Sequence, residues 1–179
     1  MTQLCQADGS ILLVIDPQSR LMPAIHEADA VVRRCSELAR GARELGIPVV
    51  GTEQNPEGLG RNVPELRALC DTTLTKFHFA AVDEPGFVEQ LPPERRTIVV
   101  CGCEAHVCVL QTALRLLESG YAVKWVADPV GSRRVTDRDT ATARARTLGA
   151  DIVTTEMVLF EWLRSSQHAS FRSILKTLR

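Results

Sequence analysis

Three residue types that cooperate in nucleophilic catalysis occur at separated points of the sequence: Asp16, Lys76 and Cys108. Cys108 lies in the first turn of a predicted helix, where free backbone N–H groups and the positive end of the helix dipole stabilise a thiolate. A nearby lysine lowers the pKa of such a thiol further, and a carboxylate carries its proton. We therefore expect a reactive cysteine with a depressed pKa, provided that the fold brings these three side chains together.

Each of these residues also has an ordinary structural interpretation. An aspartate after a strand often stabilises a turn, a lysine in a loop is usually solvated, and a cysteine in an apolar helix usually packs in the core. A catalytically silent scaffold or small-molecule binding protein is therefore the alternative hypothesis. A redox-sensing thiol is a further one, but no resolving cysteine forms a C-x-x-C motif with Cys108. The reactivity of the Cys108 thiol distinguishes an enzyme from a scaffold.

Four potential soft-metal ligands, Cys101, Cys103, His106 and Cys108, lie close together in the sequence. Cys101 and Cys103 are two residues apart on a predicted strand and should point to the same face, whereas Cys108 begins a helix that turns away. Closed zinc sites usually combine two well-separated groups of ligands. We therefore expect no bound metal here, and we predict no other cofactor.

Short apolar segments alternate with longer helical ones along the chain. The predicted strands are Ile11–Ile15, Ile47–Gly51, Thr72–Thr75, Thr97–Gly102, Tyr121–Ala127 and Asp151–Val153. The predicted helices are Ala28–Leu45, Pro64–Leu69, His106–Ser119, Thr136–Leu148, Glu156–Arg164 and Ser170–Leu178. The alternation predicts one domain over residues 1–179, a three-layer α/β/α doubly wound fold with a mainly parallel sheet of five or six strands. The rest of the segment Thr52–Ala81 is predicted to be a long loop.

In an open parallel sheet, ligands bind beyond the carboxyl ends of the strands, near the point where the strand order reverses. Asp16, Lys76 and Cys108 each follow a predicted strand, so all three are expected at this edge. Other side chains at the same edge are candidates for contact with a substrate. They are Gln18, Glu53, Phe79 and His106.

The composition disfavours several classes of protein. The 179 residues are 45% hydrophobic with a formal net charge of −1, and no basic run is present to hold nucleic acid or an anionic membrane. Apolar runs are too short to cross a bilayer, and the first residues do not resemble a secretory signal. Six cysteines in such a chain are expected to be reduced thiols, which favours the cytoplasm.

Several segments together resemble the isochorismatase-like superfamily of cysteine hydrolases. Ile11–Gln18 (ILLVIDPQ), Lys76–Ala80 (KFHFA) and Val100–Ala113 (VCGCEAHVCVLQTA) look like its three signature blocks in order and spacing. A subgroup of small, poorly assigned hydrolases is also similar in Thr52–Leu59 (TEQNPEGL), Asp128–Arg133 (DPVGSR) and Thr154–Phe160 (TTEMVLF). The resemblance covers nearly the whole chain and implies a homo-oligomeric hydrolase acting on a small amide or related carbonyl substrate.

The resemblance also assigns roles to individual residues. It makes Asp16 the general base and acid, Lys76 the residue that tunes or orients the thiolate, and Cys108 the nucleophile that forms a thioester. It places the oxyanion hole at the backbone N–H groups of Glu104 and Cys108, next to a cis peptide bond between Cys103 and Glu104.

Three departures refine this interpretation. Ala80 replaces a serine that is common after the family's lysine. The stretch after the second strand contains no histidine, so the metal site of the superfamily's nicotinamidases is not expected. The superfamily's isochorismatases, which act on a vinyl ether, lack the nucleophilic cysteine, so Cys108 favours carbonyl chemistry.

Overall fold

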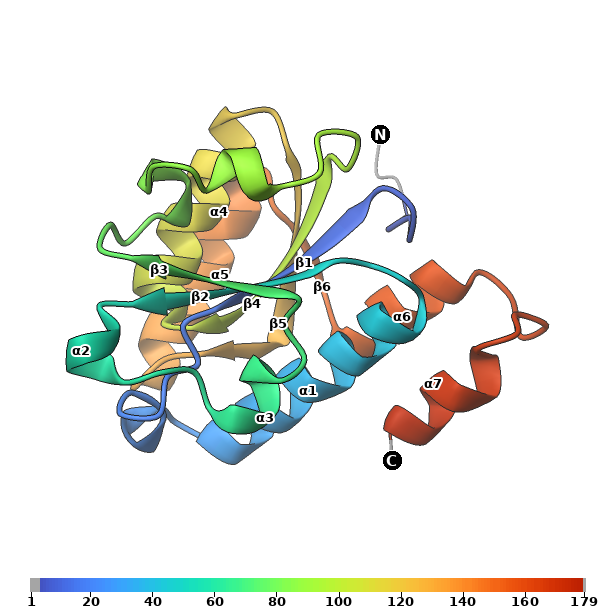
Figure 1. Ribbon diagram of the computed structural model, residues 1–179, viewed down its shortest axis with the longest axis horizontal. Helices are drawn as coiled ribbons and strands as arrows, with labels where there is room; N and C mark the ends of the chain where they lie inside the picture. The colour runs from blue at the N-terminus through green and yellow to red at the C-terminus, as the bar shows by residue number, and fades with distance from the viewer. Residues whose placement is uncertain (1–3, 179) are drawn as a thin grey trace.

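A central parallel sheet lies between two layers of helices in the computed structural model, which describes residues 4–178 (Figure 1). Residues 1–3 and 179 of the predicted domain lie outside the described part. The strands are β1 (Ser10–Ile15), β2 (Val49–Gln54), β3 (Thr72–Lys76), β4 (Thr97–Cys103), β5 (Ala122–Gly131) and β6 (Asp151–Val153). Their order is β3-β2-β1-β4-β5-β6, and every neighbouring pair is parallel. The predicted doubly wound α/β/α fold is thus confirmed.

Seven α-helices occur among the described residues. They are α1 (Ala28–Glu44), α2 (Pro56–Leu59), α3 (Pro64–Arg67), α4 (Leu110–Glu118), α5 (Val135–Thr147), α6 (Thr155–Leu163) and α7 (Phe171–Thr177). Short 3-10 turns are η1 (Met22–Ala24), η2 (Ala81–Asp83) and η3 (Val88–Gln90). Within residues 4–178, no helix has the length and apolar character needed to cross a membrane.

The central strand β1 shows why the sheet is covered on both faces. Leu12 and Val14 pack in one core with α1, α6 and α7, whereas Ile11, Leu13 and Ile15 pack in a second core with α4 and α5. Side chains alternate between the faces of a strand, so an uninterrupted apolar run fits only a strand that is buried on both sides. The two cores hold the carboxyl ends of the strands in fixed positions.

Several segments differ from the sequence-based expectation. Strand β5 runs to Gly131, beyond the predicted end at Ala127, because it pairs with β4 as far as Cys103↔Gly131. Strand β2 continues to Gln54 because β3 pairs with it as far as Gln54↔Lys76. Helix α2 lies where a loop was predicted, and Pro56 fits its first turn, where no backbone N–H is needed. The predicted helix after β4 begins with one wide π-helical turn, η4 (Ala105–Val109), marked by a bond of 3.2 Å from the Val109 N–H to the Glu104 carbonyl.

The strand order reverses between β1 and β4, and the two strand ends approach closely there. Ile15 pairs with Gly102, and a Cβ added to Gly102 would overlap the carbonyl oxygen of Ile15. Gly102 also has φ of +112°, a conformation that favours glycine. The residues that follow these strands, Asp16 and Glu104, therefore lie at the switch point where ligands bind in this fold.

Candidate active site

Asp16 follows β1 directly and is buried. Its backbone has φ of +49°, a left-handed conformation that aspartate tolerates better than most residues. The Thr52 hydroxyl donates a hydrogen bond of 2.7 Å to Oδ1, and Oδ2 lies 2.7 Å from Lys76 Nζ. An ionised carboxylate oxygen carries more than one lone pair, so the contact with Lys76 leaves one on Oδ2 that can accept a proton.

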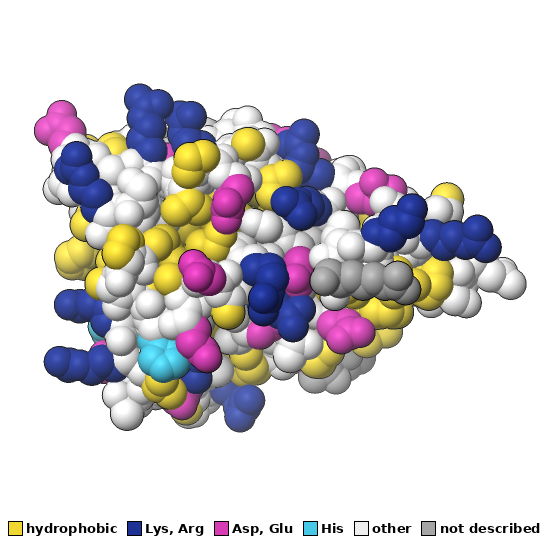
Figure 2. Space-filling view, turned by 90° about the horizontal axis from the view of Figure 1, so that it is seen from below, with side chains coloured by type: hydrophobic (Ala, Val, Ile, Leu, Met, Phe, Trp, Pro, Cys, Tyr) yellow, Lys and Arg dark blue, Asp and Glu magenta, His cyan; other side chains and the backbone are white. Residues whose placement is uncertain are grey.

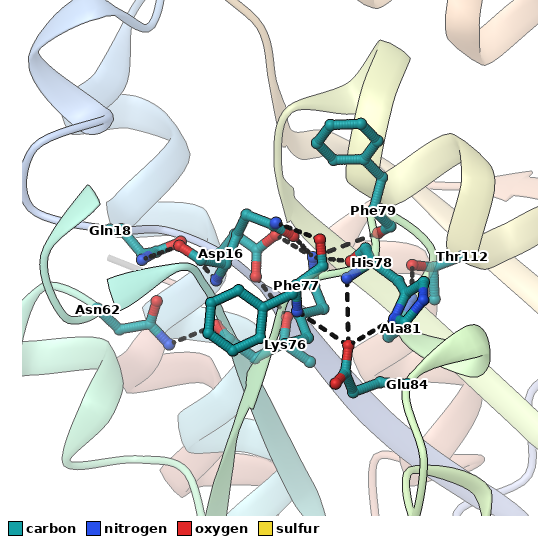
Figure 3. Close-up of polar contacts among 12 residues, drawn as sticks. Asp16, Gln18, Asn62, Lys76, Phe77, His78, Phe79, Ala81, Glu84 and Thr112 are labelled. Carbon is teal, nitrogen blue, oxygen red and sulfur yellow. Dashed lines mark hydrogen bonds and ion pairs between the residues drawn. The ribbon is translucent and has the colours of Figure 1, made fainter. Parts of the chain in front are cut away.

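Lys76 is the last residue of β3, and its side chain is only 1% exposed. Its ammonium group contacts Asp16 Oδ2 and Gln54 Oε1, each at 2.7 Å. It also donates to the carbonyl oxygens of His78 at 3.3 Å and Phe79 at 3.2 Å. In Figure 3, Asp16 and the segment that contains His78 and Phe79 lie around Lys76. Oxygen atoms thus surround a buried cation, as burial of a charge requires.

Cys108 lies in η4 and is 7% exposed, and its thiol interacts with both Asp16 and Lys76. The structure thus brings the three predicted catalytic side chains together. The pKa of the Cys108 thiol is raised to about 12, because burial and, after it, the Asp16 carboxylate raise it by more than Lys76 lowers it. The expected depressed pKa is therefore wrong for the resting site. The helix terminus and Lys76 favour the thiolate, but desolvation and the adjacent Asp16 carboxylate outweigh them.

The raised pKa predicts how Cys108 reacts with iodoacetamide. Between about pH 7 and pH 10 the labelling rate should rise about tenfold per pH unit, because only the thiolate reacts and its fraction grows at that rate below the pKa. Peptide mass spectrometry can follow each cysteine separately. A rate at Cys108 that is already constant below about pH 8 would show that the resting group is a thiolate.

A cavity of about 360 Å³ opens at this edge of the sheet, and Asp16 and Cys108 line it. The other lining residues are Leu21, Ala24, Gln54, Leu59, Phe79, Glu104, Val107 and Arg133. Aliphatic and aromatic side chains form much of the wall. The charged residues in the wall are paired with opposite charges. Lys76 lies against Asp16, and the Arg133 Nε lies 2.9 Å from Glu104 Oε1. Such a cavity suits a small organic molecule.

The four predicted substrate-contact residues have different positions. Phe79 lines the cavity. Gln18 is buried and bonds in both directions with the backbone of Gln54, at 2.8 and 3.0 Å. Glu53 accepts from the Asn62 N–H at 2.9 Å. His106 Nδ1 lies 3.0 Å from the Ser132 hydroxyl. The structure thus gives the last three residues supporting contacts outside the cavity wall.

The loop between β4 and η4 has the geometry that the family resemblance implied. The peptide bond between Cys103 and Glu104 is cis.

The side chains of Cys101 and Cys103 pack in the core on the α1 side of the sheet, whereas Cys108 packs on the opposite side. Over residues 4–178, no group of three His, Cys, Asp or Glu residues is arranged to hold a metal ion.

Several lining residues were not predicted individually. Arg133 lies in a segment that carried the family resemblance, but nothing in its spacing showed that the loop after β5 reaches the site. Leu21 and Ala24 come from the turn after β1, and Leu59 from α2, where a loop was expected. Isolated aliphatic residues in short irregular segments give no periodic signal, so only the folded chain identifies them as cavity walls.

The fold and this site define the protein as a Rossmann-like α/β protein with a buried aspartate–lysine pair beside a cysteine. The family model described as "Isochorismatase domain" matches residues 10–157. The chain is 37% identical to isochorismatase domain-containing protein 2 of Xenopus laevis over 172 residues, 95% of this chain and 83% of the relative. The chain therefore belongs to the isochorismatase family.

Solved structures agree with this assignment. The structure described as MAR1 ribonuclease from Caenorhabditis elegans is 33% identical, with a TM-score of 0.93, covering 98% of this chain and 92% of its own. YcaC from Pseudomonas aeruginosa, described with hexane-2,5-diol and covalent acrylamide, is 25% identical with a TM-score of 0.92, covering 99% and 92%. YcaC of Escherichia coli, described as an octameric hydrolase of unknown specificity, is 22% identical with a TM-score of 0.88, covering 99% and 97%. Family membership supports a hydrolase.

Proposed function

We propose that the protein is a cysteine-dependent hydrolase of a small amide or related carbonyl compound, with Cys108 as nucleophile and Asp16 and Lys76 as its partners. The buried Asp16–Lys76 ion pair beside the Cys108 thiol, at the wall of a small cavity, carries this proposal. Buried ion pairs are costly to desolvate and are weak sources of stability. A buried ion pair at the ligand-binding edge of a sheet is therefore better explained by a role in catalysis than by a contribution to stability.

The proposed reaction has two halves. Asp16 Oδ2 takes the thiol proton as the Cys108 sulfur attacks the carbonyl carbon, so an S–C bond forms and the carbonyl oxygen becomes negative. The tetrahedral species then collapses, the C–N bond breaks, and Asp16 returns the proton to the leaving amine. Water attacks the thioester with Asp16 as base, which releases the acid and regenerates the thiol. Lys76 lies 2.7 Å from Asp16 Oδ2 and favours the thiolate as it forms.

The backbone N–H groups of Glu104 and Cys108 are proposed to bind the oxyanion. They belong to the loop and turn that begin at the cis peptide bond, beside the cavity. Hydrogen-bond donors fixed before the reaction stabilise such a charge without reorganisation. The P. aeruginosa neighbour is described with covalent acrylamide, a small electrophile, and this is consistent with a nucleophilic side chain at the corresponding site of this chain.

Trapping of the acyl-enzyme tests this proposal directly. The protein is incubated with a panel of small aliphatic and aromatic amides and esters, quenched in acid, and measured by intact and peptide mass spectrometry. We expect an acyl adduct on the peptide that contains Cys108, together with release of the amine or alcohol. Turnover of any panel member without an adduct on Cys108, under conditions that slow deacylation, would contradict the mechanism.

A small molecule is a better substrate for this chain than RNA, although the C. elegans neighbour is described as a ribonuclease. Figure 2 shows Lys and Arg side chains mixed with Asp and Glu on the face in view, without a stripe of one sign. Arg133, which lines the cavity, is already paired with Glu104. A nuclease normally needs a basic path for the phosphate backbone. We expect no cleavage of a mixed RNA pool under conditions that support amide hydrolysis.

We also propose that the protein forms a homo-oligomer in the cytoplasm. The E. coli neighbour of the same fold is described as octameric, and all six cysteines of this chain are free thiols. Light scattering coupled to size-exclusion chromatography should give a mass that is a multiple of 19.7 kDa. A mass equal to one chain at micromolar concentration would rule out a stable assembly.

A further inference from the structure

Glu84 makes a set of contacts with the segment that follows Lys76. Its Oε2 accepts hydrogen bonds from the backbone N–H groups of Phe77 at 2.9 Å and His78 at 3.1 Å. The same oxygen lies 2.9 Å from His78 Nδ1. The His78 hydrogen bond and the Phe77 N–H lower the pKa of Glu84 to about 2. One carboxylate therefore fixes two consecutive peptide groups.

The segment held in this way also supplies two of the ligands of Lys76. The carbonyl oxygens of His78 and Phe79 accept from Lys76 Nζ at 3.3 and 3.2 Å. These peptide groups come directly after the two that Glu84 binds, and Figure 3 shows Lys76, His78, Phe79 and Glu84 close together. The carboxylate thus acts on Lys76 through the backbone, without touching it. Glu84 and Lys76 also line one small cavity of about 30 Å³.

Residue 80 does not contribute to holding this segment through its side chain. Ala80 has no hydroxyl or other polar side-chain group, so it cannot fix the segment by a side-chain hydrogen bond. Three other side chains do so from outside: Glu84 at its start, Gln54 of β2, whose Nε2 donates to the Phe77 carbonyl oxygen at 2.8 Å, and Thr112 of α4 at its end, where the hydroxyl accepts from the Ala81 N–H at 2.9 Å. Residues that support an active site from a distance keep its geometry within the tolerance that catalysis needs.

We infer that Glu84 is a positioning residue of the active site, which holds residues 77–79 so that the carbonyl groups of His78 and Phe79 fix the Lys76 ammonium beside Asp16 and Cys108. This inference rests on the proposed function, because it assigns Glu84 a role in the same chemistry. His78 turns its ring toward Glu84, is 57% exposed, and is not among the residues that line the cavity. Its backbone matters to the site through its carbonyl oxygen, and its ring lies outside.

The test measures the alkylation of Cys108 by iodoacetamide in the full chain, so it needs no substrate. The labelling rate at about pH 8 should fall about tenfold in Lys76→Ala, since Lys76 favours the thiolate. Glu84→Ala should slow labelling about three- to tenfold, and Glu84→Gln, which keeps an oxygen for the two N–H groups, should stay within about twofold of the parent. Asp83→Ala removes a carboxylate from the same turn that pairs with Arg115, and it should leave the rate unchanged.

The outcomes separate this inference from the proposed function. A slowed Glu84→Ala variant with normal thermal unfolding, rescued in Glu84→Gln, supports the positioning role. If Glu84→Ala labels like the parent while Lys76→Ala is slow, the positioning role is overturned and the Asp16–Lys76–Cys108 mechanism stands. If Glu84→Ala is slow while Lys76→Ala is unchanged, the effect does not pass through Lys76 and the inference is overturned as well. A double variant no slower than Lys76→Ala would locate the effect at Lys76.

Discussion

Replacement of Cys108 by alanine should reduce amide hydrolysis by at least about a thousandfold, because no other group near the cavity can form the thioester. The Asp16–Lys76 ion pair does not depend on the thiol, so the variant should fold normally and unfold within a few degrees of the parent. Steady-state turnover and thermal unfolding monitored by circular dichroism give the two quantities. Loss of activity with an intact fold is the expected result.

The matched control is Cys70→Ala. Cys70 is a partly buried thiol whose Sγ lies 3.3 Å from the Leu66 carbonyl oxygen, outside the residues that line the cavity. Its replacement should leave turnover within about twofold, as expected for a substitution remote from the chemistry. A Cys108→Ala protein that kept full turnover would refute the cysteine mechanism, whereas equal losses in both variants would indicate that loss of a buried thiol damages the fold.

The sequence predicts the scaffold well because the scaffold depends on repeated local signals. The apolar runs in β1 and β4 specify strands buried on both faces, and strand–helix alternation leaves few topologies. The switch-point rule then places Asp16 and Cys108 at one edge of the sheet. The position of Lys76 is harder to predict, because it ends β3, a strand whose partly exposed residues give a poor periodic signal in the sequence.

The parts that the sequence did not predict depend on several distant segments at once. The pKa of Cys108 is a balance between burial, Asp16 and Lys76, and burial is known only after η4 has packed. Gln18 and Glu53 lie at the predicted edge, yet their polar atoms contact the backbone at Gln54 and Asn62. Glu84 carries no motif and is recognised only by its bonds to the segment after Lys76.

Replacement of Asp16 by asparagine should affect both activity and stability, in contrast to the loss of Cys108. Asparagine tolerates the left-handed backbone of residue 16 and keeps a similar shape, but it cannot take a proton from the thiol. Turnover should fall by at least about a hundredfold. The Lys76 charge would remain buried without its counter-ion, so the free energy of unfolding should fall by about 3–5 kcal/mol.

Two companion variants separate these effects when chemical denaturation and turnover are measured together. Asp16→Asn combined with Lys76→Met removes the unpaired charge, so it should recover much of the lost stability while remaining inactive, because a buried pair replaced as a unit costs little. Thr52→Val removes only the hydrogen bond to Asp16 Oδ1, so it should cost about 1 kcal/mol and a modest part of the activity. If Asp16→Asn retained its activity, another base would have to deprotonate Cys108. If the double variant were less stable than Asp16→Asn, the contacts of Lys76 with the surrounding carbonyl groups and Gln54 would contribute more to the free energy of unfolding than its ion pair with Asp16.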